Sequence, residues 1–170
     1  MANAVVQLNT MLKSFKEYLN EAAVAHAEGS YASLWPTEKS KHDIWEMVKK
    51  FNLPDPVDPE DYHCTVMYSR KAISDKNYST TNVNIKAKLL NFRFLVHEDK
   101  TLVLELESPE ISKLFESYKK LGATWDFPEY IPHISICTKI QDENIPLPKL
   151  LDGNFIIRFD KLVVEPLVIN

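Results

Sequence analysis

The sequence is poor in glycine and cysteine, and it has no excess of basic residues. Only 3 of its 170 residues are glycine, which excludes collagen-like and glycine-rich designs. Two cysteines are too few for a disulfide framework, and they favour a reducing compartment. The net charge of −4 argues against long nucleic acids as partners, because general affinity for them comes from a basic surface. A small anionic ligand stays compatible with this charge, since a pocket needs only local donors.

Long apolar runs are also absent. No stretch approaches ~18 apolar residues, so the sequence predicts no membrane span. The start, Met1 to Val6, has no basic segment ahead of an apolar one, so we expect no secretory signal and a cytosolic protein. Hydrophobic residues make up 45% and charged residues 26%, as in ordinary globular proteins. Length and composition together predict a single domain of residues 1–170.

Hydrophobic periodicity divides the chain into helices and strands. Thr37 has the form of a cap for the second helix, and Pro109 and Gly122 mark the start and end of the third. The predicted helices are residues 5–27, 41–50 and 109–121. The predicted strands are residues 62–68, 83–96, 101–107, 131–139 and 155–169, the last being one strand or a hairpin around Asp160 and Lys161. Residues 30–36, 69–81 and 141–148 are predicted links or loops.

An internal repeat relates two parts of the chain. Trp45 to Tyr68 aligns without gaps with Phe115 to Thr138, at a shift of 70 residues. Each segment contains a helix, a proline-bearing linker and a strand that opens with a histidine, any residue and a hydroxyl residue. The matched tetrapeptides are His63-Cys64-Thr65-Val66 and His133-Ile134-Ser135-Ile136. The repeat predicts two pseudo-symmetric halves.

The two motifs have a spacing that suits a strand. Residues i and i+2 of a strand point to the same face, so His63 projects with Thr65, and His133 with Ser135. If the two strands are neighbours, two imidazoles and two hydroxyls surround one cavity. This set of groups suits a phosphodiester.

Imidazole has an ordinary pKa of about 6.5, so near neutrality one ring can be neutral and the other protonated. The neutral ring can deprotonate an attacking hydroxyl, and the charged ring can protonate the leaving oxygen. The hydroxyls can donate to the non-bridging oxygens, where charge accumulates. Because acid, base and oxyanion donors are all present, we predict neither a metal nor another cofactor.

The motifs have two other interpretations. The histidines could be hydrogen-bonded residues at strand starts without chemistry, or they could bind zinc together with Cys64 and Cys137. Strand parity opposes a metal, and also a disulfide, because Cys64 points away from the face of His63 whereas Cys137 shares the face of His133. The chain also lacks the Cys-x-x-Cys spacing of structural zinc sites. Both cysteines are therefore predicted to be core residues.

The paired motifs resemble the signature of the two-histidine (2H) phosphoesterase superfamily, and the resemblance extends over most of the chain. It implies an α+β bilobal fold, in which two pseudo-symmetric, interleaved lobes have antiparallel sheets flanked by helices and the active site in the cleft between them. The stretches Tyr31 to His42 and Asp61 to Ser69 more closely resemble the anti-CBASS proteins of T4-like phages. Members of that family are metal-independent phosphodiesterases, which degrade the cyclic di- and trinucleotide messengers of bacterial CBASS immunity in the host cytosol.

The resemblance also implies roles for individual residues. His63 and His133 become the catalytic pair, and Thr65 and Ser135 the phosphate-holding hydroxyls, with Ser135 standing where threonine is commoner. An aromatic before the second helix is expected to stack on a base, and we assign Tyr31. Glu165 interrupts an otherwise apolar last strand, where a carboxylate could accept from an exocyclic amine of a base. A packing or loop tyrosine and a strand-end charge are the alternatives for these two.

The remaining candidates are interpreted more simply. The tryptophans Trp35, Trp45 and Trp125 are predicted packing residues, with Trp125 also a candidate to line the site.

The functional prediction is hydrolysis of 3′–5′ linkages in cyclic oligoribonucleotides by attack of the ribose 2′-hydroxyl. A 2H phosphoesterase of RNA 2′,3′-cyclic phosphate ends and a non-catalytic nucleotide sponge are the alternatives. Either histidine can be the base. The preferred bases, the ring size, the oligomeric state and whether the product stops at the 2′,3′-cyclic phosphate stay open.

Overall fold

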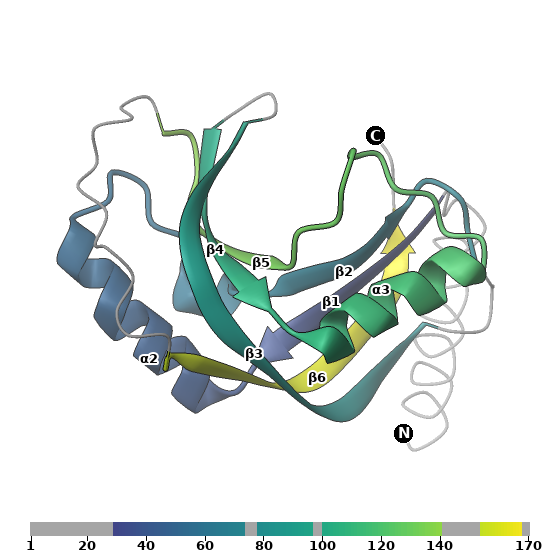
Figure 1. Cartoon of the computed structure of the whole chain (residues 1–170), viewed down its shortest axis with the longest axis horizontal. Coiled ribbons are helices and arrows are strands. Elements are labelled where there is room, and N and C mark those ends of the chain that lie inside the picture. Colours follow the sequence, from purple (N-terminus) through teal and green to yellow (C-terminus); the bar gives the residue numbers. More distant parts are fainter. Residues whose placement is uncertain (1–28, 74–77, 97–99, 141–153, 168–170) are drawn as a thin grey trace, which may run out of the picture.

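The computed structural model describes residues 29–73, 78–96, 100–140 and 154–167 (Figure 1). The predicted helix of residues 5–27 and the predicted loop of residues 141–148 lie outside these ranges. The helices are α2 (Glu38–Val48) and α3 (Pro109–Lys120). The strands are β1 (Gly29–Pro36), β2 (Cys64–Ser69), β3 (Ser79–Val96), β4 (Lys100–Glu107), β5 (His133–Cys137) and β6 (Ile156–Leu167). In the described part of the chain, no helix is long and apolar enough to cross a membrane.

The six strands form one antiparallel sheet in the order β2-β1-β6-β3-β4-β5. The long strands β3 and β6 bend strongly, so that the sheet curves around an open face (Figure 1). As a result β2 and β5, which end the sheet on opposite sides, contact each other. The strands of the two histidine motifs therefore meet edge to edge, although they are not hydrogen-bonded neighbours in the sheet.

The 70-residue shift extends to the whole described fold. The elements β1, α2, β2 and β3 are followed by β4, α3, β5 and β6 in the same sequence. The half of the sheet made of β2, β1 and β6 takes its inner strand, β6, from the second repeat. The half made of β5, β4 and β3 takes its inner strand, β3, from the first repeat. The cross-strand pairs also correspond: Ser33–Thr65 with Val103–Ser135, and Tyr31–Glu165 with Thr101–Leu95. The two halves are thus interleaved in one sheet.

One face of the sheet is apolar and packs against both helices. Ile44 of α2 and Ile111 of α3 are completely buried, together with the sheet residues Leu34, Leu104 and Ile134. The predicted cap of α2 is confirmed, because the Thr37 hydroxyl accepts from the Ser40 backbone. At the start of α3 the Ser108 hydroxyl accepts from the Ile111 backbone. Gly122 follows α3 with a φ of 97°, a conformation that favours glycine. Thr65 of β2 and Ser135 of β5 alternate with buried residues of their strands and belong to the other face.

Long-range pairing overrides local signals at three places, where the sequence predicted a link, a loop and, as one of two alternatives, a hairpin. Residues 30–36 form β1 rather than a link, since they pair with both β2 and β6. A hairpin around Asp160 and Lys161 does not form, because Lys161 is paired on one side with Trp35 and on the other with Asn82. The polar residues Ser79–Asn82 likewise belong to β3, where they pair with β6.

Candidate active site

The two histidines are held in the same way at the starts of β2 and β5. Nδ1 of His63 donates to the Asp61 carbonyl at 2.7 Å, and Nδ1 of His133 donates to the Ile131 carbonyl at 2.7 Å. A carbonyl oxygen can only accept a hydrogen bond, so Nδ1 of each ring carries a hydrogen. In both halves of the repeat Nε2 is therefore the ring nitrogen that this backbone contact does not occupy.

The predicted hydroxyl residues lie beyond the histidines on the same strands. Thr65 lies opposite Ser33 of β1, and Ser135 opposite Val103 of β4. The Tyr31 hydroxyl hydrogen-bonds with the Thr65 hydroxyl at 2.7 Å. Tyr31 therefore fixes one of the two hydroxyls in the site.

The two motifs are joined directly where β2 meets β5. The Tyr130 hydroxyl, just before β5, donates to the Thr65 main-chain carbonyl at 2.9 Å. Burial raises the pKa of the Cys64 thiol to about 12, although a hydrogen bond with the His133 backbone acts in the opposite direction. These contacts place the start of β5 against β2.

The surroundings of His133 favour the neutral form of its imidazole. Burial lowers its pKa, and the hydrogen bond to the Ile131 carbonyl opposes this effect. The charge of His63 lowers the pKa further, whereas that of Glu105, its partner on β4, raises it. The charge of His63 therefore reaches the His133 ring.

A pocket of about 680 Å³ opens beside the motifs. Tyr31, Thr65, His133 and Ser135 line it from the sheet. Its walls come from the end of the β3–β4 pair and from the connection between α3 and β5, which stand on opposite sides of the open face in Figure 1. The remaining lining residues are mostly apolar: Tyr68 of β2, and the wall residues Leu95, Val96, Thr101, Trp125, Phe127, Pro128, Glu129 and Ile131. Among the described residues the lining contains no lysine or arginine, and Trp125 lies in it as one of our two interpretations expects.

His63 and Glu165 are not part of this lining, but both are neighbours of Tyr31, which is. The Tyr31 ring meets the His63 ring edge-on, with 6.3 Å between the centroids. Tyr31 is also paired with Glu165 across β1 and β6, and it lies in a strand rather than a loop. Burial raises the pKa of Tyr31, the hydrogen bond with Thr65 lowers it, and the charge of Glu165 raises it. All six predicted site residues thus either contact or pair with Tyr31 or line the pocket with it.

Sequence reasoning missed the contact between Trp35 and His63. The two rings are stacked, with centroids 5.4 Å apart and planes inclined by 29°. The indole N–H donates to the buried Ser33 hydroxyl at 3.0 Å, which fixes the ring. The equivalent position in the second half is Glu105, opposite His133. Trp35 and Glu105 are also 70 residues apart. The sequence would have related them if the repeat had been extended towards the N-terminus to include β1.

Both cysteines are core residues, as predicted. Cys64 and Cys137 are buried and have free thiols. Among the residues that the structure describes, no group of three or more histidine, cysteine, aspartate or glutamate residues is arranged to hold a metal ion.

A family model described as "Anti-CBASS protein Acb1" matches residues 28–170. The chain belongs to the Acb1 family of anti-CBASS proteins. Among its relatives, the Acb1 of Vibrio phage KVP40 is 29% identical over 111 residues, which cover 65% of this chain and 72% of that protein. The Acb1 of Enterobacteria phage T4 is 26% identical over 131 residues, which cover 75% of this chain and 86% of that protein.

Solved structures show the same fold at low sequence identity. TT0787 of Thermus thermophilus superimposes with a TM-score of 0.59 at 12% identity, covering 79% of this chain and 86% of that one. E. coli LigT complexed with NADP+ gives a TM-score of 0.59 at 14% identity, covering 81% and 86%. This Acb1 family member therefore has the α+β fold of LigT-like 2H phosphoesterases, as the paired motifs predicted.

The half-buried His133 should make the stability of this Acb1 family member depend on pH. Its folded pKa lies below the value of about 6.5 expected in the unfolded chain, so the unfolded chain binds more protons. The contribution of His133 is then fully present above about pH 6.5 and is lost as the pH falls through the folded pKa. We expect the free energy of unfolding to decrease on acidification from about pH 7.5 to 5, and to decrease less in His133→Asn.

Urea denaturation of the wild type and the variant at several pH values measures this difference. His42→Asn, which replaces an exposed histidine of α2, is the control and should retain the wild-type slope. A slope that His133→Asn leaves unchanged would contradict the expectation.

Proposed function

We propose that this protein is a metal-independent phosphodiesterase, which hydrolyses 3′–5′ linkages of cyclic di- and trinucleotide messengers and so lets a phage evade CBASS defence. The observation that carries the proposal is the matched presentation of two imidazoles. In each half of the repeat a backbone carbonyl holds Nδ1, which leaves Nε2 to exchange a proton. Membership in the Acb1 family supports the choice of messenger and the biological setting.

The proposed reaction has two proton transfers and one displacement. Nε2 of one histidine takes the proton of the ribose 2′-hydroxyl, and the 2′-oxygen attacks the adjacent phosphorus. The bond from phosphorus to the 5′-oxygen breaks, and Nε2 of the other histidine protonates that oxygen. The ring opens to a 2′,3′-cyclic phosphate, which water then converts to a 3′-phosphate with the histidines in exchanged roles.

Hydroxyls and a protonated imidazole take the place of lysine and arginine side chains in this proposal. The described lining of the pocket contains no lysine or arginine, so Thr65 and Ser135 are assigned as donors to the non-bridging oxygens. Tyr31 lies in the lining next to Thr65 and offers a ring on which a base can stack, a contact worth about 1–3 kcal/mol. Glu165, across from Tyr31, is assigned to accept from an exocyclic amine of that base. The pocket volume of about 680 Å³ lies within the range for small-molecule sites, roughly 300–1,000 Å³.

The test is incubation of the purified protein with a panel of cyclic di- and trinucleotides in excess chelator, with products measured by mass. We expect ring opening that chelator does not slow. A linear RNA with a 2′,3′-cyclic phosphate end, tested alongside, should react more slowly. Recovery of the intact ring after denaturation of the mixture would instead identify a nucleotide sponge, and loss of activity with chelator would contradict the metal-free mechanism.

A further inference from the structure

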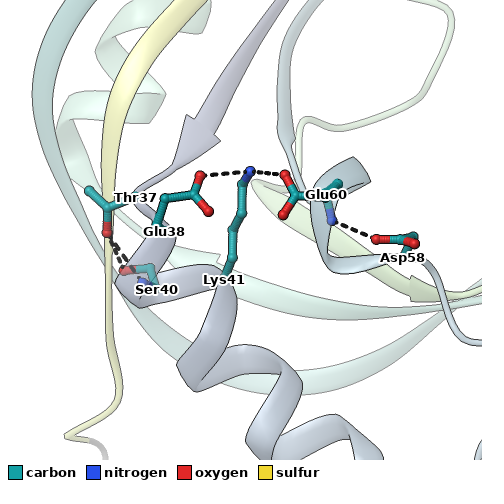
Figure 2. Close-up of polar contacts among 6 residues, drawn as sticks. All are labelled: Thr37, Glu38, Ser40, Lys41, Asp58 and Glu60. Carbon is teal, nitrogen blue, oxygen red and sulfur yellow. Dashed lines mark hydrogen bonds and ion pairs between the residues drawn. The ribbon is translucent and has the colours of Figure 1, made fainter.

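Lys41 is a lysine of α2 that is largely removed from water. Its side chain is only 10% exposed, and its Nζ lies 2.8 Å from Glu60 Oε2 and 3.0 Å from Glu38 Oε1 (Figure 2). A buried ammonium group is costly unless it is paired, and the two carboxylates provide that pairing. Glu38 belongs to the same helix, whereas Glu60 comes from a separate turn. The pair with Glu60 therefore joins two elements.

The turn that carries Glu60 also carries the carbonyl that holds His63. The turn is Pro59–Asp61, and Asp58 caps its start by accepting from the Glu60 backbone at 2.9 Å (Figure 2). The residue after Glu60 is Asp61, whose carbonyl accepts from Nδ1 of His63. A shift of this turn would move that carbonyl and change the tautomer and direction of the His63 ring.

The start of α2 is itself fixed to the sheet. The Thr37 backbone donates to the Arg158 carbonyl at 2.8 Å, and the Arg158 backbone donates to the Ser40 hydroxyl at 2.9 Å. Lys41 follows directly after Ser40. A continuous set of contacts thus runs from β6 through the start of α2 and Lys41 to the turn before His63.

The second half of the repeat anchors its histidine at the same position by other means. Tyr130, three residues before His133, corresponds to Glu60, three residues before His63. The Tyr130 ring stacks on Phe115 of α3, with centroids 4.0 Å apart and planes inclined by 5°. The next residue, Ile131, supplies the carbonyl for His133. One histidine turn is therefore tied to its helix by an ion pair, and the other by an aromatic stack.

We propose that Lys41 is a positioning residue for His63. By holding Glu60, it keeps the Asp61 carbonyl in line with Nδ1 of His63 and keeps Nε2 directed at the reacting phosphate. Its role in catalysis rests on the function proposed above, whereas its effect on the ring is independent of any substrate.

The test compares Lys41→Met and Glu60→Gln with Lys39→Met. Lys39 forms an exposed ion pair with Asp43 on the same helix, so its variant removes a similar pair that does not reach the histidine turn. We expect the first two variants to lower kcat about tenfold with KM changed less than about twofold, because the ring loses its alignment while the pocket remains. Lys39→Met should match the wild type, and Lys41→Arg should restore most of the rate.

Nitrogen-15 NMR of the histidine rings gives the readout that a general loss of stability would not produce. We expect Lys41→Met and Glu60→Gln to mix the tautomers of His63, with His133 unchanged in the same spectrum. Glu60 has an exposed side chain, so Glu60→Gln tests the proposal even if Lys41→Met folds poorly.

Equal changes at both rings, or an unchanged His63 ring in both variants, would overturn the proposal. If the wild type cleaves no cyclic nucleotide, the proposed function fails, and the ring signals still decide whether Lys41 positions His63.

Discussion

Replacing His63 or His133 with asparagine should slow cleavage of a cyclic dinucleotide by about 10²–10⁴-fold while nucleotide binding persists. The asparagine amide can still donate to the backbone carbonyl that holds Nδ1 in the wild type, at Asp61 or Ile131. It has no group at the place of Nε2, so one proton transfer is lost. The pocket walls, which come from other segments, are not altered.

Single-turnover kinetics with excess enzyme measures the chemical step, and calorimetry with the same nucleotide measures binding. The variant with both histidines replaced should be little slower than the slower single variant, since both groups act in one displacement. His42→Asn is again the matched control. Near-wild-type turnover in either single variant would remove that histidine from the mechanism.

A cyclic dinucleotide that lacks the 2′-hydroxyl next to the cleaved linkage should not be cleaved at a measurable rate. In the proposed reaction that oxygen is the nucleophile, so its removal leaves nothing for the neutral imidazole to activate. The effect should exceed that of losing one histidine, because an acid–base group contributes about 10²–10⁴-fold whereas the attacking atom is indispensable.

Product masses report this result directly. An analogue with both 2′-hydroxyls replaced should bind and be recovered intact, and one with a single replacement should open only at the linkage that keeps its neighbouring hydroxyl. Cleavage of the fully substituted ring at the normal rate would mean that water attacks phosphorus. The two histidines would then retain acid–base roles, but the 2′,3′-cyclic phosphate product would be excluded.

The sequence predicted those parts of the fold that depend on neighbouring residues. Thr37 and Gly122 mark the start of α2 and the end of α3 as expected, because caps act within one helical turn. Alternation in residues 101–107 predicted β4, since one face of that strand is buried. The burial of Cys64 followed from strand parity in the same way.

Other features depend on residues that are distant in the chain. The residues of β1 predict a link because the two partners of this strand, β2 and β6, are not visible in its own sequence. The stacking of Trp35 on His63 and the ion pair of Lys41 with Glu60 require β1, α2 and the turn before β2 to be packed together. The hydrophobic periodicity of a single helix or strand carries no information about such contacts.

The sequence by itself determined that this chain carries two equivalent motifs, each with a histidine and a hydroxyl on one face of a strand. That follows from the two-residue period of a strand, which is a property of the backbone alone. Only the tertiary structure decided that the two motifs meet. They lie at opposite ends of the sheet order, and they come together because the sheet curves and the two repeats exchange their inner strands. Curvature and strand exchange arise from pairing between distant segments, so neither half of the sequence contains them.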